Sequence, residues 1–371
     1  MKILITTGLF PPQIGGPATY SKLLLEKLPE YGYRVEIASF GTVLCLPKII
    51  RHIIYFFTIL FKGFSADIIY AQDPVSVGLP SMLAAKILRK KFFLKIVGDY
   101  AWEQGVQRSR VVDHLDKFST EYRKYPFLIR FFKRIEYFTA RSAKKIIVPS
   151  NYLKKIVSNW GIPKDKIFVI YNAFEKPTLL ETKEELRKKF GFRGPVVVSV
   201  GRLVPWKGFS VLIETIPELL KEFPELKFYI IGDGPDKNCL KSQISNLNPE
   251  DKIILTGKLP QEKVFQYIKA SDVFVLNTSY EGFSHQLLEV LSMETPIITT
   301  KAGGNVEIIE DGKNGLFIPY NDKKAIQMAV STILKDKTYG EKLAEQGFKS
   351  LKMFTEENML NRLDGVLRNV L

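Results

Sequence analysis

The sequence has few cysteines and no apolar leader, and each absence excludes a class of protein. Cys45 and Cys239 lie too far apart to have the ligand spacing of a zinc site or to form a disulfide framework. We therefore expect reduced thiols in a cytoplasmic protein. The opening residues do not read as a signal peptide, because Thr6–Gly8 interrupt their apolar run and Pro11–Pro12 end it.

A long apolar run that could span a membrane is also missing. The most lipid-like stretch, Ile49–Phe61, has only about 13 residues where a span needs roughly 20, and it contains Arg51 and His52. Two interpretations of it stay open. It is either a buried helix of a first domain, or an interfacial helix whose aromatic face enters a membrane while Lys48, Arg51 and Lys62 lie near headgroups.

Metal and dinucleotide signatures are absent as well. The sequence has three histidines and no group of His, Cys and Asp with the spacing of metal ligands, so we expect no structural metal and no metal cofactor. The pair Gly15-Gly16 is not followed by a third glycine at the spacing of the dinucleotide fingerprint. A nicotinamide-dependent enzyme is therefore the least favoured class.

What the chain does have is length and an uneven charge. Its 371 residues are too many for one core and predict two domains. Residues 1–175 contain 27 Lys and Arg against 13 Asp and Glu, a net charge of +14, whereas residues 176–371 have a net charge of +1. A basic first half predicts an anionic partner. Because no nucleic-acid-binding module is evident, we expect lipid headgroups or a phosphorylated acceptor and no nucleic acid.

Short apolar runs alternate with amphipathic segments in two series, which is typical of parallel sheets covered by helices. The predicted strands are Lys2–Thr6, Arg34–Ser39, Asp67–Ala71, Phe92–Val97, Lys145–Pro149 and Ile167–Tyr171, then Val196–Val200, Lys227–Ile231, Lys252–Leu255, Asp272–Leu276, Ile297–Thr299 and Leu316–Ile318. The predicted fold class is α/β, with two doubly wound Rossmann-like domains at 1–172 and 173–354 facing a cleft, and a terminal amphipathic helix at 355–371. Ligands of such sheets bind beyond the carboxyl ends of the strands.

The stretch Asn277–Thr300 contains an informative pair of carboxylates. Glu281 and Glu289 are eight residues apart, so on one helix their side chains would diverge by roughly 80° and about 12 Å. If Glu281 precedes the helix and Glu289 lies in its second turn, both can reach one ligand. Three amides would face the same space, those of Gly282, Phe283 and Ser284. Free amides at a helix start attract anions, which predicts a ligand with a polyhydroxyl part and a phosphate part.

Other candidates follow predicted strands. Arg202 and Lys207 follow the first strand of the second series, where a guanidinium fork and an ammonium group could meet a diphosphate. Gly232 ends the next strand. Gly15 and Gly16 follow the first strand of the chain and either let a ligand approach the backbone or form a tight turn.

Asp99, Trp102 and Glu103 follow the strand predicted at Phe92–Val97. A carboxylate beside an aromatic ring could bind a sugar hydroxyl. The alternative is that Asp99 caps the next helix.

Together these residues resemble the family-4 retaining glycosyltransferases, which have the GT-B fold. The motifs that carry the resemblance are Gly15-Gly16, Arg202 with Lys207, Glu281 with Glu289, GKLP at Gly257–Pro260, Gly303-Gly304, and SNY…VIYNAF at Ser150–Phe174. Each motif is weak alone, but their order and spacing are specific, and the likeness covers nearly the whole chain.

The resemblance implies a nucleotide-diphosphate sugar held mainly by the second domain, an acceptor held mainly by the first, and no metal. The implied donor contacts are Arg202 and Lys207 for the diphosphate, Glu289 for the ribose, Lys258 and Leu259 for the base, and Glu281 with the Phe283 and Ser284 amides for the sugar. Gly16 would approach the phosphates on domain closure. Transfer in this family retains the anomeric configuration, commonly by front-face attack.

Two positions depart from the family pattern and leave the sugar open. Many relatives have a histidine where this chain has Gly98-Asp99, so either Asp99 takes over a contact with the donor sugar or that contact is absent. The loop commonly read as EGFG is EGFSH here, with Ser284 and His285 altering the pocket.

Basic and aromatic residues concentrate in Arg123–Lys145. The candidates for acceptor or membrane contact are Trp102, Glu103, Arg123, Lys124, Arg130, Lys133 and Arg134. We therefore predict a retaining glycosyltransferase that is peripheral on the cytoplasmic face of an anionic membrane and transfers a hexose or related sugar to a glycan or lipid-linked acceptor. The alternatives are a nucleotide-sugar epimerase or hydrolase of the same fold, and a non-catalytic nucleotide-sugar-binding protein.

Overall fold

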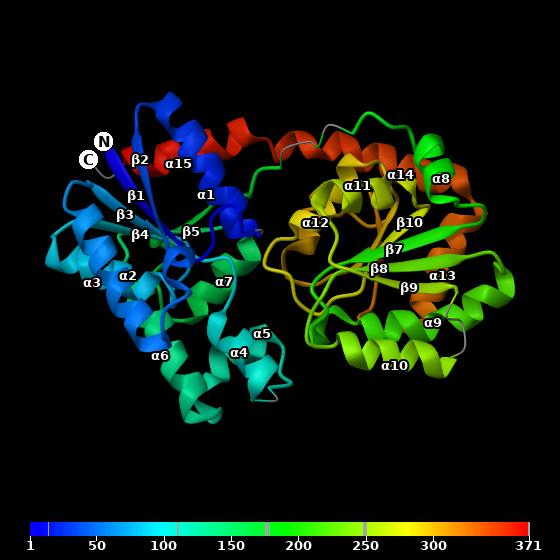
Figure 1. The fold of residues 1–371 in the computed structure, drawn as a ribbon, viewed down its shortest axis with the longest axis horizontal. Helices are drawn as coiled ribbons and strands as arrows, with labels where there is room; N and C mark the ends of the chain where they lie inside the picture. The colour runs from blue at the N-terminus through cyan, green and yellow to red at the C-terminus, as the bar shows by residue number, and fades with distance from the viewer. Residues whose placement is uncertain (14, 110, 175–176, 178, 248–250, 370–371) are drawn as a thin grey trace. The chain divides into compact units, whose positions relative to one another are not determined.

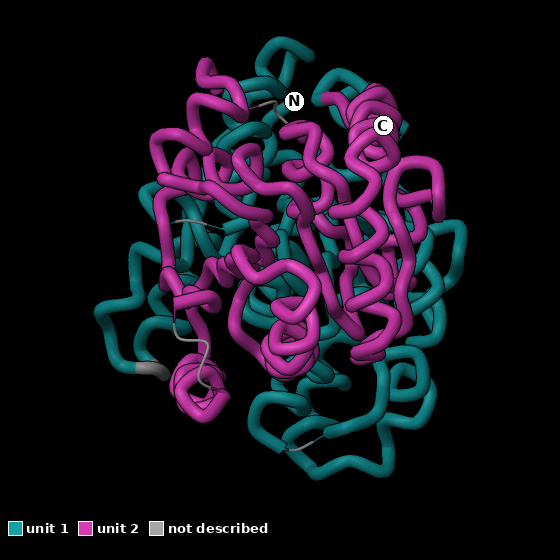
Figure 2. Tube along the Cα trace, turned by 90° about the vertical axis from the view of Figure 1, so that its right-hand side faces the viewer, with its two compact units in different colours: residues 1–173, 356–371 teal, residues 174–355 magenta. Residues whose placement is uncertain are grey.

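The computed structural model divides the chain into two compact units (Figures 1 and 2). It describes every residue except 14, 110, 175–176, 178, 248–250 and 370–371. Unit 1 contains residues 1–173 and 356–371, and unit 2 contains residues 174–355. Each unit has a six-stranded parallel sheet with helices on both faces, which confirms the predicted doubly wound α/β class.

The sheet of unit 1 has the strand order β2-β1-β3-β4-β5-β6. Its strands are β1 (Lys2–Thr7), β2 (Arg34–Ser39), β3 (Ile68–Ala71), β4 (Lys91–Lys95), β5 (Lys145–Val148) and β6 (Ile167–Val169). Its helices are α1 (Gly16–Lys27), α2 (Lys48–Gly63), α3 (Gly78–Ile87), α4 (Tyr100–Arg108), α5 (Leu115–Glu121), α6 (Phe127–Ser142), α7 (Asn151–Asn159) and α15 (Glu356–Arg368).

Crossover direction assigns the helices of unit 1 to the two faces of the sheet. The β1-to-β2 connection runs one way along the sheet, and the connections that contain α2, α3 and α6 run the other way. Because such crossovers are right-handed, α1 covers one face and α2, α3 and α6 cover the opposite face. The terminal helix α15 joins α1, since Leu363 and Leu24 lie in one buried cluster with Ile5 and Tyr70.

Unit 2 has the strand order β12-β11-β10-β7-β8-β9. Its strands are β7 (Val196–Val200), β8 (Lys227–Ile231), β9 (Ile253–Gly257), β10 (Val273–Leu276), β11 (Ile297–Thr300) and β12 (Leu316–Ile318). Its helices are α8 (Lys183–Phe190), α9 (Phe209–Glu222), α10 (Lys237–Leu247), α11 (Gln261–Ala270), α12 (His285–Ser292), α13 (Lys323–Lys335) and α14 (Lys337–Ser350). β7 and β10 are buried along their whole length, as their continuous apolar runs predicted.

Some predicted boundaries shift. α1 ends as an α-helix at Lys27 and continues as a 3-10 turn over Leu28–Tyr31, because Pro29 has no N–H for the next α-helical bond. The strand predicted at Phe92–Val97 ends at Lys95.

The lipid-like stretch forms α2, a helix with one buried side and one exposed apolar side. Tyr55 and Ile59 are fully buried against the sheet, whereas Phe57 and Phe61 are 48% and 78% exposed. One stripe of the helix therefore belongs to the core, and the other is apolar and open to solvent. Among the described helices, none is long and apolar enough to cross a membrane.

Candidate functional site

The candidate site lies at the carboxyl edge of the unit 2 sheet, where β7 and β10 are neighbours. From β7 the chain moves towards β8 on one side, whereas β10 continues towards β11 on the other. The crossover helices diverge at such a switch point and leave a crevice beyond the strand ends, which is where doubly wound sheets bind ligands. The loops that follow these two strands contain Lys207 and Glu281.

Lys207 and Glu281 contact each other, although 74 residues separate them in the chain. Lys207 ends a 3-10 turn at Pro205–Lys207, and its Nζ donates a hydrogen bond to Oε1 of Glu281. The two side chains are only 13% and 14% exposed, so the pair is shielded from bulk water and its attraction is only weakly screened. An ammonium group has three N–H donors, and this bond uses one of them.

Arg202 lies on the loop after β7, the same loop that contains Lys207. Its side chain is exposed and makes no ion pair with any residue that the structure describes. A Cβ atom on the preceding Gly201 would lie 3.9 Å from both Lys207 Cδ and Gln286 Oε1. Gln286, in the first turn of α12, is therefore a neighbour that the sequence motifs did not indicate.

The buried Asn277 and the exposed Asn321 together fix the loop that contains Lys207. Asn277 is fully buried, and its Nδ2 donates to the Gly208 carbonyl at 3.0 Å and to Asn321 Oδ1 at 2.8 Å. The Asn321 amide donates back to Asn277 Oδ1 at 3.0 Å. Gly208 has a left-handed φ of 55°, and a Cβ there would lie 2.3 Å from Asn277 Nδ2. Only glycine fits this position without displacing the network.

Gly208→Ala is expected to destabilise unit 2 by about 2–4 kcal/mol, because it combines an unfavourable φ with a clash against the buried Asn277 side chain and its hydrogen bonds. Gly191→Ala is the matched control: Gly191 has a φ of 68°, but a Cβ there meets no atom within 4 Å. The control should lose only about 1 kcal/mol. Chemical unfolding of both variants measures the difference, and equal losses would contradict the steric argument.

The loop 281–284 is fixed by a neighbouring turn and by the start of α12. The Gly304 amide donates to the Glu281 carbonyl at 2.9 Å, and Ser284 caps α12 by accepting from the Leu287 amide at 3.4 Å. The Gly303–Glu307 segment is a 3-10 turn, and the amide of its Gly304 is used to hold this loop. Glu281 thus precedes the helix and Glu289 follows in its second turn, as predicted from their spacing.

Glu289 is partly buried on α12. Burial raises the pKa of its carboxyl to about 7, and a 3.4 Å hydrogen bond from Gln261 Nε2 opposes this shift. A carboxyl with a pKa near neutrality is typical of a group that meets a ligand in a partly dry site. Gln261, at the start of α11, is a second neighbour that the motifs did not indicate.

Gly232 belongs to the framework of the site. The Gly232 amide donates to the Gly257 carbonyl at 3.0 Å. A Cβ on Gly232 would lie 1.8 Å from the Gly201 carbonyl oxygen, so the loops after β7 and β8 approach too closely for any side chain at position 232. Lys258 and Leu259 follow directly at the end of β9, with Lys258 exposed and Leu259 partly buried. All these residues therefore lie at the same sheet edge as Lys207.

In unit 1, Gly15 and Gly16 begin α1 at the carboxyl end of β1. This too is a switch point, because β1 lies between β2 and β3. Gly15 is the N-cap residue, and a Cβ on Gly16 would meet no described atom within 4 Å. The space in front of the Gly16 backbone is thus open within unit 1.

Asp99 does not face a ligand, which corrects its assignment as a catalytic or sugar-binding residue. It is fully buried, caps α4 by accepting from the Trp102 amide at 2.9 Å, and forms an ion pair with Lys133. Lys133 also lies 3.1 Å from Glu136, whose other oxygen accepts from the Tyr100 amide at 2.7 Å. The capping interpretation of Asp99 is the one that the structure supports.

Two residues assigned to acceptor or membrane contact are also interior. Lys133 is 2% exposed, and its ammonium group lies 3.8 Å from the centroid of the Trp160 ring. Trp102 is 2% exposed, and its Nε1 donates to the Asp113 carbonyl at 2.9 Å. Neither side chain can touch a membrane, because both fill the core between α4 and α6. The sequence suggested otherwise because a run of alternating basic and aromatic residues does not show which side chains point inward.

The other members of that group are closer to solvent. Arg123, Arg130 and Arg134 are exposed, and Glu103 is partly exposed. Lys124 is exposed but forms ion pairs with Asp113 and Glu121.

Comparison with known proteins identifies the family. Residues 14–175 match the model of Glycosyltransferase Family 4, and residues 182–350 match that of Glycosyl transferases group 1. The chain belongs to the group 1, family-4-type glycosyltransferases. An uncharacterized glycosyltransferase of Methanocaldococcus jannaschii is 25% identical over 95% of this chain and 93% of its own length.

Other relatives of this glycosyltransferase match over different lengths. The N-acetyl-alpha-D-glucosaminyl L-malate synthase of Bacillus anthracis is 23% identical over 100% of this chain and 98% of its own. The mannosylfructose-phosphate synthase of Agrobacterium fabrum is 27% identical, but the match spans 57% of this chain and about half, 49%, of that protein.

Solved structures confirm the GT-B fold of this glycosyltransferase. Anabaena Alr3699/HepE, solved in complex with UDP, covers 100% of both chains with a TM-score of 0.77 and 19% identity. The sucrose-phosphate synthase of Thermosynechococcus elongatus covers 100% of this chain and 98% of its own with a TM-score of 0.81 and 17% identity. In the described part of this glycosyltransferase, no group of three or more His, Cys, Asp or Glu side chains could hold a metal ion.

Proposed function

We propose that this glycosyltransferase moves a sugar from a nucleotide-diphosphate donor to an acceptor with retention of anomeric configuration. The observation that carries the proposal is the shielded contact between Lys207 and Glu281 at the unit 2 switch point, with Arg202 and Glu289 nearby in the same loops and helix. A cation and a carboxylate that already touch in a partly dry crevice are preorganised for a ligand that contains both phosphates and hydroxyls.

Arg202 and Lys207 would bind the diphosphate. As the bond to the sugar breaks, negative charge grows on the departing phosphate, and fixed cations stabilise that charge more than they stabilise the intact donor. Lys207 keeps two N–H donors for phosphate oxygens while Glu281 holds its ammonium group. The exposed guanidinium of Arg202 provides a planar fork for the same oxygens.

The proposed contacts to the sugar, the base and the ribose follow from where the remaining residues lie in the site. Glu281 and the amides of Phe283 and Ser284 would bind the sugar, and the Lys258-Leu259 backbone would meet the base. Glu289 would accept hydrogen bonds from the ribose hydroxyls. No metal takes part in this proposal, because the diphosphate charge is met by Arg202 and Lys207.

Donor affinity is expected to fall in acid because of Glu289. An acid whose pKa is raised to about 7 becomes protonated as the pH drops through that value and then accepts fewer hydrogen bonds from hydroxyls. A nucleotide sugar should therefore bind about tenfold more weakly near pH 6 than near pH 8. The intact donor is the right probe, because its phosphodiester groups do not titrate in this range, and calorimetry measures the affinity.

Glu289→Gln is the control for this dependence. It has no titrating carboxyl, so its affinity should be weak and flat over the same range. A wild-type pH dependence that survives in Glu289→Gln would assign the titration to another group and contradict the ribose contact.

We further propose that the acceptor is a glycan or a lipid-linked molecule and that the enzyme acts at an anionic membrane surface. The net charge of +14 in residues 1–175 supports an anionic partner. The alpha-monoglucosyldiacylglycerol synthase of Streptococcus pneumoniae, 24% identical over 80% of this chain, is a relative whose name specifies a lipid product.

The test of the proposed function is a panel of nucleotide sugars screened by thermal shift, followed by product analysis. A bound donor raises stability by mass action, so the panel identifies the base and sugar. The donor that binds is then incubated with and without lipid and glycan acceptors. Transfer with the donor's anomeric configuration, read by NMR, supports the proposal. Turnover of the donor alone to an epimer or free sugar favours the epimerase or hydrolase instead, and binding without turnover favours a non-catalytic protein.

A further inference from the structure

Large apolar side chains are exposed on three neighbouring helices of unit 1. On α2 and the residue after it they are Ile50, Ile53, Ile54, Phe57, Phe61 and Phe64, on α3 Leu83 and Ile87, and on α6 Phe127, Leu128, Phe131 and Phe138. We call this set the apolar face. Soluble monomers expose single apolar side chains, but a contiguous group of this size marks an interaction surface.

The apolar face of α2 has the periodicity of an interfacial helix. Its exposed members recur at intervals of three and four residues, so they form one stripe along the helix, and Tyr55 and Ile59 on the opposite side are buried. The stripe becomes more exposed towards the end of the helix, where Phe61 and Phe64 are 78% and 76% exposed. α2 therefore presents one apolar side to its own core and another outward.

The three helices form one surface. α2 packs against α3 and α3 packs against α6, all on the face of the sheet opposite α1 and α15 (Figure 1). Their exposed stripes therefore all face outward on the same side of unit 1.

Cations surround the apolar face, and acidic side chains are nearly absent from it. Residues 48–63, 78–91 and 122–145 contain 15 Lys and Arg and one Asp or Glu. The single acid is Glu136, which is buried against Lys133. Lys62 pairs with Glu36, and Lys124 pairs with Asp113 and Glu121, so the outward positive charge comes from the other cations of this set.

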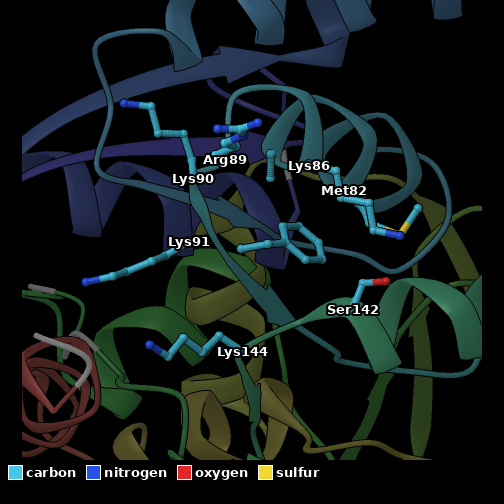
Figure 3. Close-up of a pocket in the computed structure, with 9 residues that line it drawn as sticks. Met82, Lys86, Arg89, Lys90, Lys91, Ser142 and Lys144 are labelled. Carbon is cyan, nitrogen blue, oxygen red and sulfur yellow. The ribbon is translucent and has the colours of Figure 1, made fainter.

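Two basic hollows open on this side. One has a volume of about 370 Å³ between the ends of α3 and α6, and Figure 3 shows Lys91 and Lys144 among the side chains that line it. Its lining residues are Met82, Ala85, Lys86, Arg89, Lys90, Lys91, Phe92, Ser142 and Lys144. The other, of about 510 Å³, is lined by Tyr122, Arg123, Arg130, Arg134, Tyr137 and Phe138.

In the second hollow, no ion pair reaches Arg123, Arg130 or Arg134 from any described residue. Three guanidinium groups lining one hollow repel one another unless an anion lies between them. Guanidinium binds phosphate through paired N–H donors, so a phosphate group fits this hollow.

We propose that the apolar face of α2, α3 and α6 docks on an anionic lipid bilayer, with its Ile, Leu and Phe side chains among the acyl chains and the two basic hollows holding lipid phosphates. An apolar stripe flanked by cations is what binds a membrane surface in the plane of the interface. A second copy of the same positive face would meet like charge, which disfavours self-association. The inference rests on the membrane contact of the proposed function and deepens it by naming the residues.

The test is co-sedimentation with vesicles, without donor or acceptor. Wild type should bind vesicles of phosphatidylcholine mixed equally with phosphatidylglycerol, and it should bind less at high salt and less to phosphatidylcholine alone. Phe57→Glu/Phe61→Glu should lower the bound fraction about tenfold or more, because each carboxylate must enter the acyl region. Arg130→Glu/Arg134→Glu should lower it on the anionic vesicles.

Val112→Glu/Met328→Glu is the matched control. It adds the same two charges at apolar side chains that are 91% and 70% exposed outside the apolar face, and it should bind like wild type. Hydrogen exchange of wild type provides a test without mutation, since vesicles should protect the amides of α2.

Several outcomes would overturn the proposal. They are no binding to anionic vesicles, binding that survives Phe57→Glu/Phe61→Glu in a folded protein, or no protection of α2. A wild-type dimer that this double variant converts to a monomer would assign the face to a second copy and overturn it as well. Because the assay contains no sugar donor, none of these results bears on the proposed transferase activity. Conversely, a protein that binds vesicles but transfers no sugar would contradict the transferase proposal and not the docking proposal.

Discussion

We expect Lys207→Ala to lower the turnover number for sugar transfer by about a thousandfold and to leave the fold intact. The structure places the Lys207 ammonium group against Glu281 at the β7–β10 switch point. Removing a preorganised donor from the position where negative charge develops typically reduces turnover by about 10²–10³. The effect should fall on turnover more than on donor affinity, because the charge on the leaving phosphate grows as the bond breaks. Arg202→Ala is expected to behave in the same way.

Steady-state kinetics with the donor identified by thermal shift measure the loss. Lys324→Ala is the control, since Lys324 is an exposed lysine on α13 outside the site. Lys207→Ala also leaves Glu281 without its partner, and comparison of Glu281→Gln with Lys207→Ala/Glu281→Gln separates the two effects. If the unpaired carboxylate were the cause, adding Lys207→Ala to Glu281→Gln would cost little further activity. Near-normal turnover in Lys207→Ala would remove the diphosphate assignment.

The largest expected effect on stability comes from the interior of unit 1. Lys133 lies between the carboxylates of Asp99 and Glu136, and all three side chains are at most 2% exposed. Burial and the nearby Asp99 charge raise the pKa of Glu136 above its usual range. Lys133→Ala would leave two buried carboxylates without a cation, which is expected to lower the free energy of unfolding by about 3–5 kcal/mol.

Urea unfolding followed by tryptophan fluorescence measures this loss, and Arg130→Ala is the control because Arg130 is exposed on the same helix. The control should stay within about 0.5 kcal/mol of wild type. The deficit of Lys133→Ala should shrink as the pH falls, since protonation of Glu136, whose pKa is raised, removes part of the unpaired charge. A deficit that grows in acid would contradict the ion-pair account.

A fall in turnover at full stability in Asp99→Asn would restore Asp99 to the donor site.

The sequence predicted the elements of the sheets better than it predicted side-chain direction. Val196–Val200 and Lys227–Ile231 have the predicted bounds, because a strand buried on both faces is a continuous apolar run that turn residues interrupt. β4 ended two residues early, since its run continues into the loop before Asp99. Periodicity shows that a segment is a strand or a helix, but it does not show what packs on either side of it.

Asp99 and Lys133 illustrate that limit. Both lie in stretches whose composition suggested contact with a ligand or membrane, yet they form an ion pair 34 residues apart in sequence and buried in the fold. A long-range pair of this kind has no local signal. Gln286 and Gln261 were missed for the same reason: a glutamine on a helix face is ordinary until the fold brings it beside Lys207 or Glu289.

By itself, the sequence determined the fold class, the family and the order of the motifs that we assign to the donor, because these depend on local apolar runs and on turn residues at strand ends. It also showed that Glu281 and Glu289 can reach one ligand if Glu281 precedes the helix and Glu289 lies in its second turn, which is where the structure places them. Only the tertiary structure decided which charged side chains are paired and buried and which remain exposed. The same is true of the outward side of α2: its thirteen-residue apolar stretch fits a buried helix and an interfacial one equally well, and the packing of the sheet against Tyr55 and Ile59 left Phe57 and Phe61 facing solvent.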